Sequence, residues 1–270
     1  MVLREITCRS ILSPSRIPGV AYAINPYVGC GHGCLYCYAV FMKRFTNHQE
    51  PWGQFVDVKI NGPRRLLNDL RRATPGQVLL SSVTDPYQPA EETYQITKAC
   101  LDVLQQARVP VSLLTKSALV LRDIDVLTQM RVVDVGFTVT TLDDEIRAAF
   151  EPHSSSVEER FRAIRLLSNA GIHTWIFFGP VLPYFSDREE TMSAFFHEAE
   201  QSGADHILVD GMNLYPEVWR RTEALLRARY PWILPYYRRV REEKKAYFEL
   251  LRERVKRVAQ RHAIRWRIVF

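Results

Sequence analysis

The stretch Asn25–Ala39, "NPYVGCGHGCLYCYA", decides the interpretation of this sequence. It holds Cys30, Cys34 and Cys37, three of the five cysteines in the chain. Glycines surround the first two thiols, and a glycine lets the backbone approach another group closely because it has no side chain. Thiolates at the short spacing C-x3-C-x2-C are typical ligands of zinc or of an iron–sulfur cluster. The stretch therefore indicates a metal centre, and the alternatives are a disulfide framework, structural zinc and an iron–sulfur cluster.

A disulfide framework is the first alternative, and the composition disfavours it. The chain has 270 residues and an odd number of cysteines, whereas disulfide frameworks are usual in short secreted chains with an even number. We interpret Cys8 and Cys100 as small apolar residues.

Structural zinc and a ferredoxin-type cluster both need a fourth protein ligand. His32 lies too near Cys30 in the sequence to complete a zinc site easily, and no second cysteine pair follows. Three thiolates with one vacant position suit a cubane cluster with one iron open to a substrate or cofactor, and zinc remains the alternative.

Length and composition are those of an ordinary globular protein. The residues are 47% hydrophobic and 24% charged. No apolar run approaches the roughly 20 residues of a membrane span. The first residues carry charges at Arg4 and Glu5 and lack the apolar core of a secretory signal. We therefore expect no membrane association and a cytoplasmic location.

The net charge of +6 comes from the C-terminal part of the chain. Between Arg238 and Arg267 stand twelve Lys or Arg residues and only four Glu residues, so the remainder of the chain is slightly acidic. A basic helix of this kind is usually a solvated face packed on the body of the protein. Many clustered cations also suit nucleic-acid phosphates. Nucleic acid is therefore one candidate partner of this segment.

Short apolar runs alternate with helix-like stretches along most of the chain. Nearly continuous, β-branched apolar runs are typical of parallel strands covered on both faces, and their alternation with helices predicts an α/β fold. Periodicity alone leaves a partial barrel, a complete barrel and an open doubly wound sheet as alternatives. The expected strands are Val20–Ile24, Val78–Val83, Val109–Thr115, Val132–Val139, Ile172–Phe178 and His206–Asp210.

Helices are expected between these strands and near the C-terminus. Val240–His262 is expected to form one long helix, because its apolar residues recur three, four or seven positions apart. The final residues "RWRIVF" are expected to form a strand. We divide the chain into an N-terminal arm (1–19), a core (20–214) and a basic helical extension packed on the core (215–270). The helices expected before the extension are Arg64–Arg72, Thr93–Gln106, Ala118–Gln129, Asp143–Phe150, Val157–Asn169 and Arg188–Ser202.

The cysteine loop follows the first expected strand and carries Tyr36 directly before its last cysteine. In these features it resembles the radical S-adenosylmethionine (radical SAM) superfamily. The fuller stretch resembles the branch that contains spore photoproduct lyase. The resemblance implies a partial (β/α)6 TIM-type barrel, and we expect the basic helical C-terminal extension to cover one side of it. Further segments that carry the resemblance are Ser81–Glu91, Leu113–Ser117, Phe137–Ile172 and Gly179–Pro183.

The resemblance also implies the chemistry. In this family three cysteines hold a [4Fe-4S] cluster, and its open iron binds S-adenosylmethionine. Reductive cleavage of that cofactor gives a 5′-deoxyadenosyl radical, which abstracts a hydrogen atom from a substrate. The implied substrate is a nucleic-acid lesion or modified base, and the implied electron donor is a flavodoxin or ferredoxin. The alternatives are radical chemistry on a small molecule or peptide and a non-catalytic metal-binding or electron-transfer module.

Three residues are implied at the methionine end of the cofactor. Thr84 and Asp85 match a pair that helps to hold it, and turn formation is their alternative role. Lys116 matches a lysine that pairs with the methionine carboxylate, as a point cation at a strand end could do. All three follow expected strands, at the rim where barrel enzymes place their sites.

Three further residues are implied around the nucleoside and the cluster. Tyr36 is expected near the adenine, and Tyr38 against the outer side of the cluster. Thr138 and Thr140 alternate onto one face of their strand, and we prefer Thr140 as the contact to a ribose hydroxyl. Ordinary packing is the alternative role for each of them.

Ser82 departs from the family pattern. It aligns with the cysteine that in spore photoproduct lyase delivers a hydrogen atom to the product radical, and an alcohol O–H bond is too strong for that step. We place Ser82 among the residues expected at the cofactor, and the sequence identifies no catalytic residue for the hydrogen transfer. Glu151 and Arg160 are expected to form an intramolecular ion pair.

Overall fold

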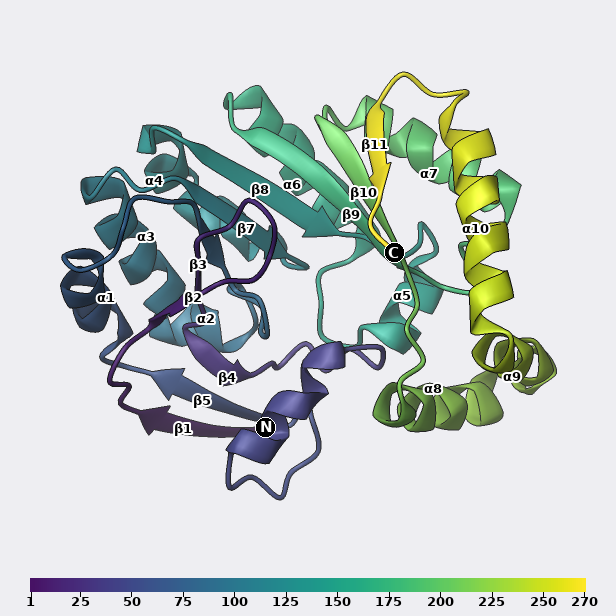
Figure 1. Ribbon diagram of the computed structural model, residues 1–270, viewed down its shortest axis with the longest axis horizontal. Coiled ribbons are helices and arrows are strands. Elements are labelled where there is room, and N and C mark those ends of the chain that lie inside the picture. The colour runs from purple at the N-terminus through teal and green to yellow at the C-terminus, as the bar shows by residue number, and fades with distance from the viewer.

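The computed structural model describes residues 1–270 and is built around one large sheet. The strands of this sheet follow the order β11-β10-β9-β8-β7-β6-β3-β2 (Figure 1). All neighbours pair in parallel except β2 and β3. The expected α/β class is confirmed, and each of the six expected strands is present. The bounds are β2 Leu12–Pro14, β3 Tyr22–Ile24, β6 Val78–Leu80, β7 Val111–Thr115, β8 Val133–Thr138, β9 His173–Val181, β10 His206–Gly211 and β11 Arg265–Ile268.

Helices connect the parallel strands, and Figure 1 shows α3, α6 and α7 behind the sheet. The main hydrophobic core joins strands and helices in one cluster. The stretch Thr93–Gln106 is divided at Gln95, where a φ of +50° ends one helix and starts the next. None of the helices combines the length and apolar character that a membrane span requires. The bounds are α1 Gly62–Leu70, α2 Ala90–Tyr94, α3 Ile96–Gln106, η2 Ala118–Asp123, α4 Ile124–Gln129, α5 Asp144–Phe150, α6 Val157–Asn169 and α7 Glu189–Gln201.

A second, three-stranded sheet carries the cysteine loop, and the sequence did not predict it. Its strands are β1 (Val2–Ile6), β5 (Phe55–Lys59) and β4 (Tyr27–Gly29), in the order β1-β5-β4. Gly29, at the end of β4, has a φ of +87°, and a Cβ atom there would lie 2.4 Å from the Phe55 carbonyl oxygen. Only glycine fits this position, and it brings the start of the cysteine loop against β5. A 3-10 helix, η1 (Tyr38–Phe45), follows the loop.

The C-terminal part is helical, but the expectation of one helix over Val240–His262 was wrong. The chain turns at Glu243, whose ψ of 36° lies outside the helical range. The apolar residues of α10 that recur three, four or seven positions apart are buried, as expected. The expected last strand is β11, which pairs with β10. The bounds are α8 Pro216–Arg229, η3 Pro231–Ile233, α9 Leu234–Glu242 and α10 Lys244–Ala259.

Two adjacent leucines test the packing of α10. Leu251 is 1% exposed, whereas Leu250 is 65% exposed. We expect Leu251→Ala to lower the free energy of unfolding by about 2–5 kcal/mol, because it leaves a cavity in the core. Leu250→Ala should change it by less than about 0.5 kcal/mol. Equal effects in urea denaturation would show that this helix does not pack as described.

Candidate active site

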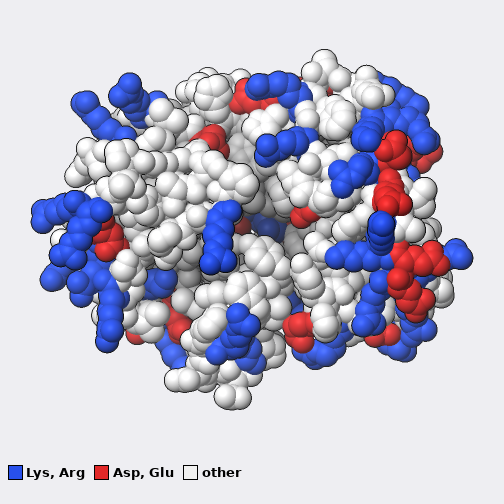
Figure 2. Space-filling view, in the orientation of Figure 1, with Lys and Arg blue, Asp and Glu red and all other residues white.

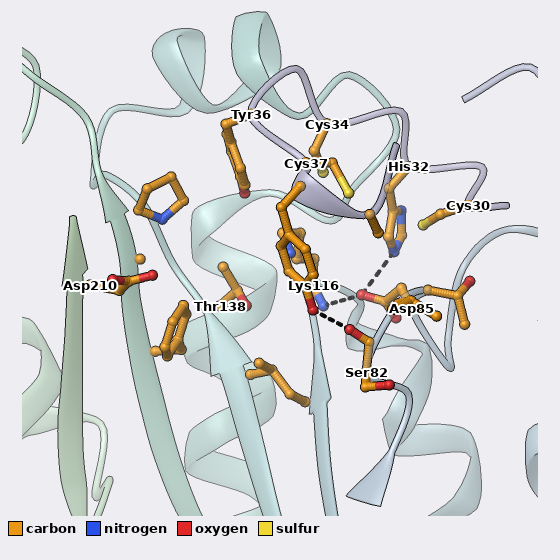
Figure 3. Close-up of a pocket in the computed structure, with 18 of the residues that line it drawn as sticks. Cys30, His32, Cys34, Tyr36, Cys37, Ser82, Asp85, Lys116, Thr138 and Asp210 are labelled. Carbon is orange, nitrogen blue, oxygen red and sulfur yellow. Dashed lines mark hydrogen bonds and ion pairs between the residues drawn. The ribbon is translucent and has the colours of Figure 1, made fainter. Parts of the chain in front are cut away.

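A cavity of about 410 Å³ lies between the cysteine loop and the carboxyl ends of the parallel strands (Figure 3). Enzymes with parallel sheets bind their ligands at this end. Figure 2 shows the mouth as a hollow in the middle of one face. Of the ten residues expected at the site, only Thr140 does not line the cavity. Those that do are Cys30, Cys34, Tyr36, Cys37, Tyr38, Ser82, Thr84, Asp85, Lys116 and, beyond the expected set, Thr138.

The three cysteines of the motif are free thiols that share this cavity. Cys30 and Cys34 are buried, and Cys37 is half-buried. Backbone hydrogen bonds of 3.3 Å, from Gly33 N to Cys30 O and from Cys37 N to Cys34 O, fold the loop between them. Burial raises the pKa of Cys34 to about 12, so its free thiol is protonated at neutral pH. A metal centre bound here must therefore displace protons.

Gln88, which the sequence did not suggest, fixes the first part of the loop. Its Oε1 accepts a hydrogen bond from Gly31 N at 2.7 Å, and its Nε2 donates to Thr84 Oγ1 at 2.9 Å. The Thr84 hydroxyl donates in turn to the Gly29 carbonyl at 2.6 Å. Thr84 thus uses its hydroxyl to hold the loop, while the residue itself lines the cavity.

The carboxylate of Asp85 organises the strand ends beneath the loop. Its Oδ1 accepts from Thr115 Oγ1 at 2.6 Å and from Tyr87 N at 2.9 Å. Its Oδ2 accepts from Lys116 N at 2.9 Å and lies 3.4 Å from His32 Nε2. Burial opposes ionisation, but His32, Lys116 and the hydrogen bonds hold the pKa of Asp85 far below its usual range. Asp85 is therefore an ionised residue whose lone pairs are mostly occupied by the protein.

Lys116 differs from Asp85 because its ammonium group has no partner within the protein. The side chain enters the cavity (Figure 3), and its Nζ lies 5.8 Å from the centre of the Tyr36 ring. Burial lowers its pKa, but Cys34, Glu151 and Asp85 outweigh that effect and hold the pKa of Lys116 above its usual value. A permanent cation with no ion pair can bind an anionic group of a ligand.

A buried ion pair anchors the second part of the loop. Glu151 and Arg160 are both fully buried and pair directly, as the sequence predicted. Glu151 also accepts a hydrogen bond from the Tyr36 hydroxyl, and Arg160 donates to the Thr138 carbonyl at 2.7 Å. Burial raises the pKa of Glu151, but Arg160 and Lys116 reverse this effect and lower it. The ion pair therefore joins the loop to β8 and α6.

The expected role of Thr140 is not supported by its position. Strand β8 ends at Thr138, so the alternation that placed both threonines on one face stops there. Thr138 lines the cavity, whereas the Thr140 hydroxyl donates to Glu151 Oε1 at 3.2 Å and is buried. Thr140 supports the anchor of the loop, and Thr138 is the threonine that a ligand could reach.

Asn25 positions the loop that carries Ser82, a role that the sequence did not reveal. Its Oδ1 accepts from Ser82 N at 2.9 Å and from Val83 N at 3.0 Å, and its Nδ2 donates to Ser82 Oγ at 3.3 Å. The Tyr38 hydroxyl donates to the Ser82 carbonyl across the rim of the cavity (Figure 3). Ser82 therefore has a fixed position on the wall of the cavity.

The wall opposite Ser82 comes from the end of β10 and the residues after it (Figure 3). The sequence did not indicate these residues. Asp210, Asn213 and Tyr215 line this side. The carboxylate of Asp210 accepts a hydrogen bond from Gly211 N at 2.9 Å, and burial raises its pKa. A carboxyl group with so little support from the protein is available to a ligand.

The match to a protein family decides the identity of the site. The model of the radical SAM superfamily matches residues 24–196, more than half of the chain, and includes the three cysteines. The chain belongs to the radical SAM superfamily. Its cofactors are therefore a [4Fe-4S] cluster and S-adenosylmethionine, and the chain is an enzyme.

The chain is also similar to individual proteins and to a solved structure. An uncharacterized protein of Methanocaldococcus jannaschii is 36% identical over 68% of this chain and 70% of its own length. An uncharacterized protein of Mycobacterium tuberculosis is 29% identical over 94% of this chain and 79% of its own length. A structure of mutant spore photoproduct lyase with bound AdoMet and dinucleoside spore photoproduct superposes with a TM-score of 0.68 at 17% identity. This match covers 85% of this chain and 66%, just under two thirds, of the lyase chain, and it shows a shared fold.

The residues of this radical SAM protein fit a cluster. Trp52 Nε1 and Arg221 Nη1 are buried without a hydrogen-bond acceptor. Trp52 lies close enough to Cys37 to favour its thiolate, and Arg221 Nη2 donates to the Gly33 carbonyl at 3.0 Å. Buried donors without acceptors are costly, and the sulfur atoms of a bound cluster would satisfy them.

The spacing of the ligands agrees with a cluster as well. No three His, Cys, Asp or Glu side chains lie close enough together to share one metal ion, as a structural zinc would require. A cubane takes one thiolate per iron, so its ligands lie further apart than those of a single ion. The absence of a single-ion site among these residues is consistent with that arrangement.

Arg160 provides a test of the anchor. We expect Arg160→Met to lower the free energy of unfolding of the metal-free protein by about 3–5 kcal/mol, because Glu151 is left as an unpaired buried charge. Arg165→Met is the control, since the Arg165–Glu198 pair is about 40% exposed and should contribute less than about 1 kcal/mol. Urea denaturation measures both. A small loss for Arg160→Met would contradict the anchoring role.

Arg221 provides a test of the electrostatic environment of the cluster. Arg221→Gln should lower the midpoint reduction potential, because a nearby positive charge stabilises the more negative reduced cluster. Arg221→Lys should stay near the parent value. Arg220→Gln is the control, because Arg220 is exposed and pairs with Glu217. A redox titration followed by electron paramagnetic resonance measures the shift, and equal potentials for Arg221→Gln and the parent would contradict the prediction.

Proposed function

We propose that this enzyme cleaves S-adenosylmethionine reductively and uses the 5′-deoxyadenosyl radical to abstract a hydrogen atom from its substrate. The observation that carries the proposal is the group of three free thiols without a fourth protein ligand, in the same cavity as an unpaired lysine ammonium. The bound cluster would supply the electron, and the bound cofactor the radical. The protein supplies binding, orientation and exclusion of water.

Each part of the cavity has a proposed task. Cys30, Cys34 and Cys37 hold the cluster. Lys116 pairs with the methionine carboxylate, for which its free ammonium group is available. Asp85 and Thr84 act mainly as positioning residues, because their side chains are engaged by the protein.

The nucleoside part of the cofactor has its own proposed contacts. We propose Thr138, in place of Thr140, for the ribose hydroxyls. Tyr36 presents its ring near the adenine, since its hydroxyl is held by Glu151. Tyr38 and Ser82 close the rim through the hydrogen bond between them.

We propose a nucleic-acid lesion or modified base as the substrate. The fold shared with spore photoproduct lyase, whose structure holds a dinucleoside photoproduct, supports this class. One feature favours the alternative, a small molecule or peptide. No cysteine other than the three ligands lines the cavity, and Cys100 is buried in the core. The final hydrogen transfer must therefore use another group, and Tyr38 and Tyr215 are the cavity tyrosines with exposed rings.

The remaining proposals concern architecture and cellular context. We propose that the parallel strands form a partial (β/α)6 barrel, with an arm at 1–19, a core at 20–214 and a basic extension at 215–270. Strand β11 of the extension adds to the sheet of the core, and β1 of the arm pairs with β5. As a radical SAM enzyme the protein needs an external reductant, for which we propose a flavodoxin or ferredoxin in the cytoplasm.

Anaerobic reconstitution tests the radical function. With dithionite and S-adenosylmethionine, the parent protein should release 5′-deoxyadenosine, and Cys34→Ala should release none above background. Cys100→Ala is the control, because Cys100 lies outside the cavity. Lys116→Gln should raise the KM for S-adenosylmethionine roughly 10- to 100-fold, the worth of one charge-assisted hydrogen bond. Release by Cys34→Ala at the parent rate, or a cluster spectrum that ignores added cofactor, would refute the function.

A further inference from the structure

Exposed aromatic side chains with stacked cations stand on one side of the cavity mouth. The η1 ledge consists of Tyr38, Phe41, Arg44 and Phe45. Their three rings are 56%, 40% and 66% exposed in chain order, although large apolar side chains are usually buried. Tyr38 stacks on Phe41 with ring centres 6.4 Å apart. The Arg44 guanidinium lies 5.5 Å from the centre of Phe41 and 4.6 Å from that of Phe45.

A similar group stands on the opposite side of the mouth. The C-terminal ledge consists of Tyr215 before α8, Arg241 of α9 and Lys244 of α10, which also line a small adjoining pocket. Tyr215 is 54% exposed, and the Lys244 ammonium lies 5.7 Å from the centre of its ring. Arg241 lies over the ring of Trp219 at 5.0 Å.

Both ledges border the same cavity. Tyr38 and Tyr215, one from each ledge, are among the residues that line it. In Figure 1, η1 lies beside the N-terminus and α8–α10 lie across the molecule from it, and Figure 2 shows the hollow between these two regions. A molecule that spans the mouth would therefore contact aromatic rings and cations on both sides.

The cations of the ledges have no acidic partner, whereas several other basic residues near the C-terminus do have one. Arg241 and Lys244 form no ion pair, although Glu242 and Glu243 are close in sequence. By contrast, many other cations of the segment already have an acidic partner. These are Arg238 with Glu223, Arg239 with Glu243, Arg254 with Asp187, Lys256 with Glu253, and Arg257 and Arg261 with Glu189.

We propose that the two ledges bind a single strand of nucleic acid across the mouth of the cavity. This proposal rests on the proposed function and assigns its substrate to that class. Bases flanking the target stack on the rings of the η1 ledge and on Tyr215, while Arg44, Arg241 and Lys244 neutralise the phosphates. The target base leaves the stack and enters the cavity.

The size of the cavity supports a strand and not a free nucleotide. A volume of about 410 Å³ is that of a site for one small ligand. With S-adenosylmethionine inside, only a small part of a substrate can enter, so most of a larger substrate must be held outside. The exposed rings can stack on bases, and the cations between them can neutralise phosphates. A duplex would keep its bases away from the rings.

Binding of a labelled oligonucleotide tests the ledges directly. The probe is a fluorescein-labelled thymidine strand of about 12 nucleotides, within the usual footprint of such sites. Its affinity for the anaerobically reconstituted protein is measured by fluorescence anisotropy. Phe45→Ala should weaken binding roughly 5- to 100-fold, the usual effect of losing one stacked base. Lys244→Gln should weaken binding. It should also reduce the slope of log affinity against log salt concentration by about one, the contribution of one phosphate contact.

Two variants of α10, the helix that begins with Lys244, serve as controls for the loss of a cation and of an apolar side chain. Lys256→Gln and Leu250→Ala change exposed residues of α10 that do not border the cavity. Both should bind the strand within about twofold of the parent, and all variants should show the parent absorbance of the cluster.

Three results would overturn the proposal. The first is parent affinity in Phe45→Ala and Lys244→Gln. The second is equal affinity for a duplex of the same length. The third is a combination of two measurements on these variants, in which an acidic flavodoxin reduces the cluster more slowly but the oligonucleotide affinity is unchanged. That result would show that the ledges bind the electron donor. Release of 5′-deoxyadenosine without nucleic acid tests the radical function separately, so the two failures can be told apart.

Discussion

The buried ion pair between Glu151 and Arg160 is the interaction on which the rest of the site depends. An ionised carboxylate is stable inside a protein only when it is paired and hydrogen-bonded, and Glu151 meets both conditions. Through Tyr36 it holds the cysteine loop, and through Arg160 it is tied to the last residue of β8. Gln88 holds the other end of the loop. The thiols can therefore face a cavity and still have a fixed position, which a catalytic centre requires.

The large sheet could be predicted because each of its six main strands shows a short apolar pattern of consecutive residues. Runs such as Val133–Thr138 are apolar and β-branched, and helices separate them. The three-stranded sheet could not be predicted in this way. Its strands β1, β4 and β5 are short and come from separate parts of the chain, and their pairing becomes visible only when the chain is folded. The helices break at Gln95 and at Glu243 because one residue leaves the helical backbone conformation, while the apolar pattern on both sides stays helical.

The site was predictable where a residue type has a characteristic chemistry, and less so where it serves another residue. The three cysteines and Lys116 are chemically distinctive at their positions. Gln88 and Asn25 act through backbone amides that come near them only in the fold, so no spacing rule points to them. Strand alternation could not show that Thr138 lines the cavity and Thr140 does not, because β8 ends at Thr138. The charge of the C-terminal segment could not show which cations are free, because several of them pair with acidic residues only in the fold.

The central claim is that the three thiols hold one cluster with one iron open to S-adenosylmethionine. Electron–nuclear double resonance on the reduced, reconstituted protein measures this contact directly. With cofactor labelled by nitrogen-15 in its amino group and carbon-13 in its carboxylate, the account predicts hyperfine coupling of both nuclei to the cluster. Absence of both couplings, together with coupling to nitrogen-15 introduced into the histidines of the protein, would show that a side chain occupies the fourth iron. That result would contradict the account.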